Sequence, residues 1–470
     1  MNDRERLLAE GSLWPLIFRF STPAILGMLV NALYNVVDRF YIGRVPVIGP
    51  AALTGLGVAF PILSVGLAFT LLFGIGAAAN ISLSLGRKDR AAAERVLGNT
   101  VTASAAAALV LTVLGIVFAD NLLRLFGASD VTLEYASAYL KTYLLGTVFV
   151  TTGIALNHSI RGSGSPMVSA LTQVLGAVLN IILDPIFIFV FGLGVRGAAI
   201  ATVISQVVSF LWVMGYILSK KSLVKIRRAN LLPRWNTLWS IFSIGASPFA
   251  LQLAASAVSI VANRTLKFYG GDDAIGAMTI MSSLSLLFLM PLFGLNQGLQ
   301  PILGFNYGAK NYARVRQALK KQIILATVYV AVCFCAVLAV PQLLVRFFVT
   351  SALESANLFA TATAALRVLF LGLPLLGVVI PVSNYFQSVG KASVAIVMTL
   401  LRQVILLIPL YLLLPVFFGL DGIWFALPSA DTASFLITAF VLFFEVRRLR
   451  RLEAGEEPAA APAAQAGTSE

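Results

Sequence analysis

Residues 21–42 read STPAILGMLVNALYNVVDRFYI, an apolar run long enough for a helix to cross the ~30 Å hydrocarbon core of a bilayer. One carboxylate, Asp38, lies inside this run. An ionised carboxylate at that depth costs roughly 2.5–3.5 kcal/mol on membrane-insertion scales, so a chain that keeps one there usually uses it. Two interpretations follow: either the adjacent Arg39 neutralises Asp38, or Asp38 is a coupling site for an ion or a proton.

The composition of the whole chain agrees with this run. Of its 470 residues, 59% are hydrophobic and 11% are charged, and the mean hydropathy is +0.91, which is typical of polytopic membrane proteins. Twelve apolar segments have the length of a membrane-spanning helix, so we predict an all-α polytopic membrane protein with 12 transmembrane helices. The segments centre on Val30, Ser64, Ala108, Gly146, Ala177, Val207, Ala255, Phe288, Val330, Gly372, Ile405 and Phe435.

The Lys and Arg residues gather on alternate connections between these segments. One side holds 24 of them, whereas the other side holds only 5, namely Arg44, Arg124, Arg196, Lys267 and Arg346. Because positively charged loops stay in the cytoplasm, this asymmetry predicts a multi-pass protein of the plasma (inner) membrane with both termini cytoplasmic. The same bias accounts for the net charge of +14, so no nucleic-acid partner is predicted.

The two halves of the chain repeat one another. STPAIL, which contains Pro23, matches ASPFAL, which contains Pro248, and GLGVRG, which ends at Gly197, matches FGLDG, which ends at Gly422. Six helices per half give the two repeats the same orientation, related by an axis along the membrane normal. We predict an N-terminal six-helix lobe (1–218), a basic cytoplasmic linker (219–238), a C-terminal six-helix lobe (239–450) and a disordered cytoplasmic tail (451–470).

A second deep carboxylate, Asp184, follows Asn180 by four residues in LNIILDPIF, so the two side chains share one helix face. Pro185 removes a backbone donor and frees a carbonyl one turn back. Carboxylate, amide and carbonyl oxygens suit Na⁺, or a carboxylate that exchanges a proton. The alternative is a hydrogen-bonded clamp between helices. Pro23, Pro185 and Pro248 are predicted to act as hinges.

Other titratable residues receive structural interpretations. Asp431, nearer a segment end, is expected to pair with Arg402 or Arg367. His158, the single histidine, lies near a cytoplasmic segment end, where a surface or packing role is more common than catalysis. The sequence has no Cys/His cluster with metal spacing and no glycine-rich phosphate loop with a lysine, so it predicts a transporter without a cofactor rather than an enzyme.

These features resemble those of the MATE (multidrug and toxic compound extrusion) transporters, in particular the MepA-like branch. The resemblance rests on YNVVDRFYIG at 34–43, on Asn180, Asp184 and Pro185, and above all on GLNQGLQPILGFNYGAKNYARVR at 294–316. It implies two homologous six-helix lobes around a central cavity that opens alternately to each side. It also implies an antiporter, coupled to H⁺ or Na⁺, that exports amphipathic organic cations. The cation-coupling site of the family, which includes a possible Na⁺ site, falls on Asp38, Asn180, Asp184 and Thr202.

The two lobes are expected to differ in function. The seventh helix, 248–267, has no acidic residue, although NorM-like and eukaryotic relatives carry a carboxylate there. The C-terminal counterparts of Asp38, Asp184 and Thr202 are Asn263, Ile408 and Leu427. We therefore predict that ion coupling resides in the N-terminal lobe alone. The predicted substrate cavity at the lobe interface is lined by Tyr34, Asn35, Phe60, Met278, Met281 and Gln297.

Two other functions stay open at this stage. A lipid-linked saccharide flippase of the same superfamily needs a basic cavity to hold pyrophosphate, whereas the deep polar pair here is acidic. A membrane-embedded transferase needs paired acids with a metal, or a nucleophile with its base, at an aqueous boundary, and no such constellation appears. The expected partners are small organic cations and the lipid bilayer, and the expected state is a monomer.

Overall fold

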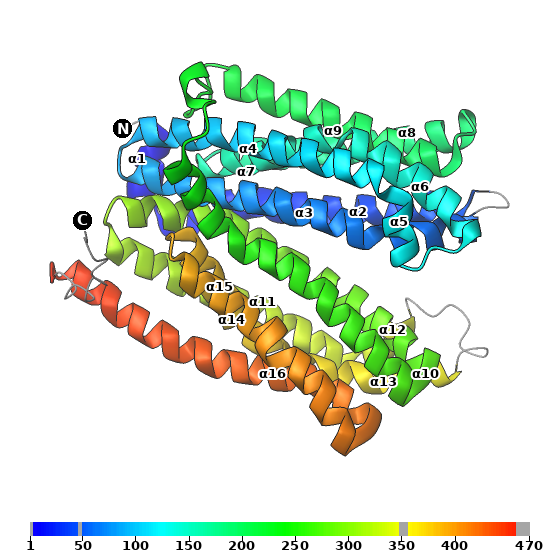
Figure 1. Cartoon of the computed structure of the whole chain (residues 1–470). Helices are drawn as coiled ribbons and strands as arrows, with labels where there is room; N and C mark the ends of the chain where they lie inside the picture. Colours follow the sequence, from blue (N-terminus) through cyan, green and yellow to red (C-terminus); the bar gives the residue numbers. More distant parts are fainter. Residues whose placement is uncertain (1–2, 46–48, 347–355, 457–470) are drawn as a thin grey trace, which may run out of the picture.

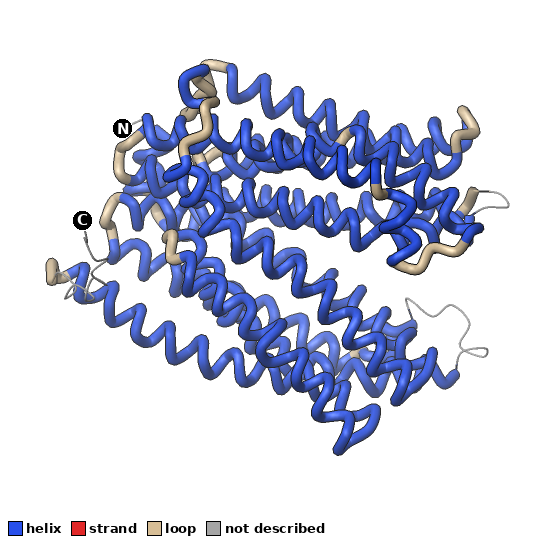
Figure 2. The backbone as a smooth tube through the Cα atoms, in the orientation of Figure 1, coloured by secondary structure: helices blue, strands red, loops and turns tan. Residues whose placement is uncertain are grey.

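The computed structural model describes residues 3–45, 49–346 and 356–456, without the side chains at 35, 36, 39, 49–53, 272 and 356–358. Nearly all of the described chain is helical, and no strand occurs within it (Figure 2). Long helices suit so apolar a chain, because a helix satisfies its own backbone hydrogen bonds when no water is available.

The helices fall into two sets that follow the chain halves. The first set is α1 (Asp3–Glu10), α2 (Leu13–Gly43), α3 (Gly49–Gly86), α4 (Arg90–Val117), α5 (Ala119–Leu125), α6 (Asp130–Leu145), α7 (Thr147–Gly162), α8 (Pro166–Pro185), the π-helical η1 (Ile186–Val190) and α9 (Gly194–Leu218). The second set, after the short η2 (Arg228–Asn230), is α10 (Trp235–Gly308), α11 (Tyr312–Ala339), α12 (Pro341–Arg346), α13 (Ala356–Leu369), η3 (Phe370–Gly372), α14 (Leu373–Ser388), α15 (Ala392–Leu400), the π-helical η4 (Leu401–Leu407) and α16 (Ile408–Glu453).

Ten segments of the described chain are long and apolar enough to cross a bilayer, with the two arms of α10 counted separately. The pair α6 and α7, which bends by 56°, supplies one more span. The segment Ala392–Glu453 has 62 residues, which is too long for one crossing. It is divided at Gly419, where φ is 57°, as α10 is divided at Gly271, where φ is 64°. Such backbone angles favour glycine. Twelve spans result, and the predicted fold class is confirmed.

The two sets form two lobes, one above the other in Figure 1. Residues 219–234 connect the lobes at the same end of the molecule as both chain termini. The lobes lie close together at that end and diverge towards the other end (Figure 1). The two lobes therefore approach each other most closely at the end that carries α1.

The closed end is built from symmetric contacts between the repeats. A Cβ atom on Gly86 of α3 would overlap the backbone carbonyl of Phe305, and one on Gly308 of α10 would overlap the carbonyl of Leu83. Each contact is the counterpart of the other, because the same spacing separates Gly86 from Gly308 and Leu83 from Phe305. Small residues allow helices to approach this closely, so these two glycines contribute to the tight packing of the lobes at this end.

Candidate functional site

A cluster of buried polar side chains lies in the N-terminal lobe, where α2, α8 and α9 meet. Asn180 Nδ2 donates to Asp184 Oδ1 at 3.0 Å and lies 3.3 Å from Thr202 Oγ1, to which it also donates. The carboxyl group of Asp38 is close enough to Asp184 for the two to interact electrostatically. All four side chains are buried, with at most 8% of each residue exposed. The structure therefore brings together the four residues of the predicted coupling site.

The local structure of α8 explains half of this cluster. Asn180 and Asp184 are one helical turn apart and face the same way. Pro185 follows directly, and the chain continues as the π-helical turn η1. Wide turns of this kind often occur at functional sites, because they re-aim side chains within an otherwise regular helix. The side chain of Arg39, the alternative partner of Asp38, lies outside the described residues.

Two oxygens of the cluster, Asn180 Oδ1 and Asp184 Oδ2, are buried and accept no hydrogen bond from the described residues. A buried acceptor without a donor costs about 1–3 kcal/mol, so a site with two of them favours an added proton or a small hard cation. Amide, carboxylate and hydroxyl oxygens are ligands that Na⁺ accepts. These oxygen ligands therefore fit both predicted coupling ions.

An aromatic wall beside the cluster was missed in the sequence analysis. Tyr139 and Tyr143 of α6 stack with ring centroids 6.2 Å apart, and Tyr139 interacts electrostatically with Asp38 and Asp184. A signal was present, because Tyr135, Tyr139 and Tyr143 recur every four residues on one face of their helix. Nothing in the sequence, however, connects that face with α2 and α8.

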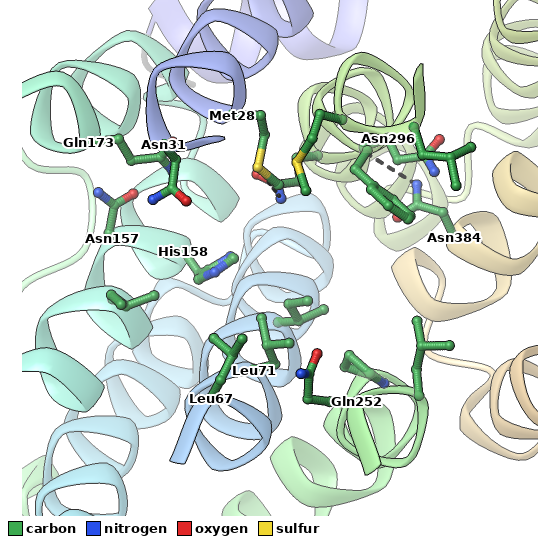
Figure 3. A pocket seen from close by; sticks show the side chains of 18 of the residues that line it. Met28, Asn31, Leu67, Leu71, Asn157, His158, Gln173, Gln252, Asn296 and Asn384 are labelled. Atoms are coloured by element: carbon green, nitrogen blue, oxygen red, sulfur yellow. Dashed lines mark hydrogen bonds between the residues drawn. The ribbon is translucent and has the colours of Figure 1, made fainter. Parts of the chain in front are cut away.

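A cavity of about 550 Å³ lies between the two lobes, and Asn180 and Thr202 form part of its wall. Side chains from both lobes surround it, as Figure 3 shows for Asn157 and Gln173 on one side and Asn384 on the other. Carboxamides stand out among its polar residues: Asn31, Asn157, Gln173, Asn180, Gln206, Gln252, Asn296, Gln297, Asn384, Gln387 and Gln403. Because carboxamides both donate and accept, such a wall accommodates varied polar groups within an apolar pocket.

Only some of the six predicted cavity residues line the cavity. Tyr34 and Gln297 line the cavity, whereas the side chain of Asn35 lies outside the described residues. The other three are not among the residues that line this cavity. Met281 is buried in the hydrophobic core, Met278 packs against that core, and Phe60 is 53% exposed on α3. The methionines that line the cavity are Met28, Met290 and Met398.

His158 lies neither at the surface nor in a purely apolar core. It is buried, lines the cavity, and its Nδ1 atom contacts a terminal nitrogen of Arg161. Arg161, which is only 1% exposed, donates through Nη1 to Gln297 Oε1 of the opposite lobe at 2.6 Å. Arginine has no acceptor, so His158 Nδ1 accepts and this ring is held neutral. Through Gln297, this pair links the two lobes beside the cavity.

The C-terminal lobe holds a different polar arrangement. Asp431 is 2% exposed and its Oδ1 accepts from Arg402 Nε at 2.5 Å, which confirms the prediction of an arginine partner. Asn263, the counterpart of Asp38, is exposed. Ile408 and Leu427 occupy the other corresponding positions. Within the described residues, the second lobe has no equivalent of the first lobe's cluster at these positions.

Two repeated helical lobes with a cavity between them, bordered by a buried carboxylate cluster, define a polytopic membrane transporter. The comparison with protein families agrees. The MatE family model matches residues 23–186 and 239–413, and the chain belongs to this family. It is therefore a multi-pass plasma-membrane transporter and not an enzyme, as predicted.

Similar proteins cover almost the whole chain. It is 29% identical to the multidrug export protein MepA of Staphylococcus haemolyticus (strain JCSC1435), over 94% of this chain and 95% of the relative. It is 28% identical to MepA of Staphylococcus aureus (strain MSSA476), over 96% and 98%. A crystal structure of a MATE in complex with MaD3S has a TM-score of 0.89 and 25% identity, over 96% of this chain and all of that one.

Proposed function

We propose that the protein is a cation-coupled antiporter that exports amphipathic organic cations by alternating access. The observation that carries this proposal is the buried pair Asp38 and Asp184 beside the cavity wall, with oxygen atoms of Asn180 and Asp184 that lack donors among the described residues. The relatives named as multidrug export proteins support the direction and the breadth of transport.

The chemistry follows from competition for negative charge. With Asp38 and Asp184 ionised, the cavity attracts a lipophilic cation, which Tyr34 and the cavity methionines can also contact. Uptake of H⁺ or Na⁺ by the carboxylates removes that charge and weakens the hold on the cation. One proton exchanged for one monovalent cation is electroneutral, so each pH unit sustains about a tenfold gradient, or ~1.4 kcal/mol.

A flippase for lipid-linked saccharides receives less support. Arg402 is the single Lys or Arg among the described residues that line the cavity, and it is paired with Asp431. A pyrophosphate carries more negative charge than one paired guanidinium balances.

The proposed orientation has both termini and the connection 219–238 in the cytoplasm, so this conformation faces outward. Pro23, Pro185 and Pro248 are the proposed hinges, each within or at the end of a helix at the cavity or the cluster. One chain supplies a complete cluster and a complete cavity, and we therefore propose a monomer.

The orientation predicts which positions an impermeant maleimide reaches. In a background with Cys333 and Cys335 replaced by serine, Ser129→Cys should react in intact cells, whereas Lys221→Cys should react only after permeabilisation. Both positions are exposed in the structure, so access depends on the side of the membrane. The reverse pattern would contradict the orientation.

The coupling proposal predicts ethidium movement in everted membrane vesicles when a Na⁺ gradient and a pH gradient are imposed separately. At least one gradient should drive ethidium accumulation, and dissipating that gradient should release the dye. Accumulation that requires ATP, or that is the same without either gradient, would contradict an antiport mechanism.

A further inference from the structure

The cavity has an acidic side and a basic side. The N-terminal wall contains Asn180 and Thr202, with Asp184 directly behind them. The C-terminal wall contains Arg402, the single Lys or Arg among the described lining residues. A simple organic cation has no use for a guanidinium in its binding site, so Arg402 needs a separate explanation.

Arg402 is held in place from one edge. It lies in the π-helical segment η4, and its Nε atom donates to Asp431 Oδ1 at 2.5 Å. Asp431 is itself buried, and Gly372 packs against it so closely that a Cβ atom there would lie 2.6 Å from Oδ2. The carboxylate therefore fixes the guanidinium without using its terminal nitrogens.

The terminal nitrogens of Arg402 make no hydrogen bond to any residue that the structure describes. The side chain lines the cavity and is 16% exposed, so these donors remain available to a bound molecule. Two parallel N–H groups of a guanidinium match the two oxygens of a carboxylate. The guanidinium of Arg402 is thus held in position, but its terminal N–H groups have no hydrogen-bond partner among the described residues.

The surrounding wall is also polar. Thr399, three residues before Arg402, has its hydroxyl 2.8 Å from that of Ser247 and 3.0 Å from that of Ser383. Gln403 follows Arg402 and lines the same cavity. These hydroxyl and amide groups can hydrate or bind an oxygen-rich group, which an apolar wall cannot do.

We propose that Arg402 binds an anionic oxygen group, such as a carboxylate, on the exported molecule, and that the cavity thereby favours zwitterions. The cationic group of the substrate faces the cluster of Asp38 and Asp184, and its anionic group faces Arg402. This inference rests on the proposed function and adds the chemical class of the preferred substrate. Asp431 acts as a positioning residue, because it holds Arg402 and does not line the cavity.

The test uses two dyes that differ at one group. Rhodamine 123 is a methyl ester and a simple cation, and rhodamine 110 is the corresponding free acid and a zwitterion. Binding of each dye to the purified full-length protein is followed by fluorescence anisotropy. The variant is Arg402→Gln with Asp431→Asn, which replaces the ion pair by two amides and so avoids a lone buried charge. Arg367→Gln, at an exposed arginine of the same lobe, is the matched control.

In the double variant, we expect the dissociation constant of rhodamine 110 to rise about tenfold relative to that of rhodamine 123. This is the size of one charge-assisted hydrogen bond. Rhodamine 123 binding and the Arg367→Gln ratio should stay near the wild-type values. An unchanged ratio in the double variant, or an equal shift in the control, would overturn the inference.

The binding ratio needs no ion gradient, so it is independent of coupling. If imposed gradients fail to move rhodamine 123, the proposed antiport is wrong, while the ratio still decides the role of Arg402. If gradients move rhodamine 123 but the ratio is unchanged, the antiport stands and the role of Arg402 is wrong.

Discussion

Asp38→Asn and Asp184→Asn should each reduce gradient-driven ethidium efflux to the background rate while the protein remains folded. The amide keeps the shape of the side chain but can neither take up a proton nor balance the charge of a cation. Because the two carboxyl groups lie together in one buried cluster, loss of either one should be sufficient. The measurement is the efflux rate at matched expression, with ethidium binding followed separately.

Asp431→Asn provides the control in the other lobe. This carboxylate is also buried, but within the described residues it is paired with Arg402 rather than with an amide and a hydroxyl. The substitution should lower the yield of folded protein, since it leaves a guanidinium without its partner, yet the folded fraction should still couple efflux to the gradient. Efflux that survives Asp38→Asn and stops with Asp431→Asn would show that the coupling site is in the C-terminal lobe and contradict the proposal.

Gly86→Ala should impair closure of the lobes at the end that carries the termini. The added Cβ atom would overlap the backbone carbonyl of Phe305, which cannot move aside as a side chain can. Such overpacking costs about 1–3 kcal/mol, which lowers the population of this conformation roughly 5- to 150-fold. Labelling of Leu67→Cys, a residue of the cavity wall, by an external maleimide in the cysteine-free background should slow accordingly.

Gly57→Ala is the matched control on the same helix, because a Cβ atom there meets nothing within 4 Å. It should leave both labelling and efflux unchanged. Equal effects of the two substitutions, or none from Gly86→Ala, would show that the glycine contact does not limit closure.

The fold was predictable because it depends on properties that the chain displays locally. Apolar segments of sufficient length become spans, and the matched motifs around Pro23 and Pro248 indicate two equal lobes. Half of the proposed coupling site was predictable for the same reason, since Asn180 and Asp184 are one turn apart. Thr202 came from the family resemblance, because helix periodicity carries no information about which other helix lies opposite.

The cavity was less predictable, for a reason specific to membranes. A helix that faces lipid on one side and protein on the other is apolar all round, so periodicity does not reveal its rotation. Met281 and Met290 are equivalent by type and lie on the same helix, yet Met281 is in the hydrophobic core and Met290 lines the cavity. The contact of Arg161 with Gln297 joins different lobes, so no pattern within either half of the sequence predicts it.

In the proposed mechanism, the ion and the drug compete for the carboxylates of the N-terminal lobe. Ethidium added to the purified, unbuffered protein should displace the bound ion, which a pH indicator detects as H⁺ or a radioactive tracer detects as Na⁺. We expect release from the wild-type protein and from Asp431→Asn, and none from Asp184→Asn. Ion release from Asp184→Asn equal to that of the wild type would contradict it.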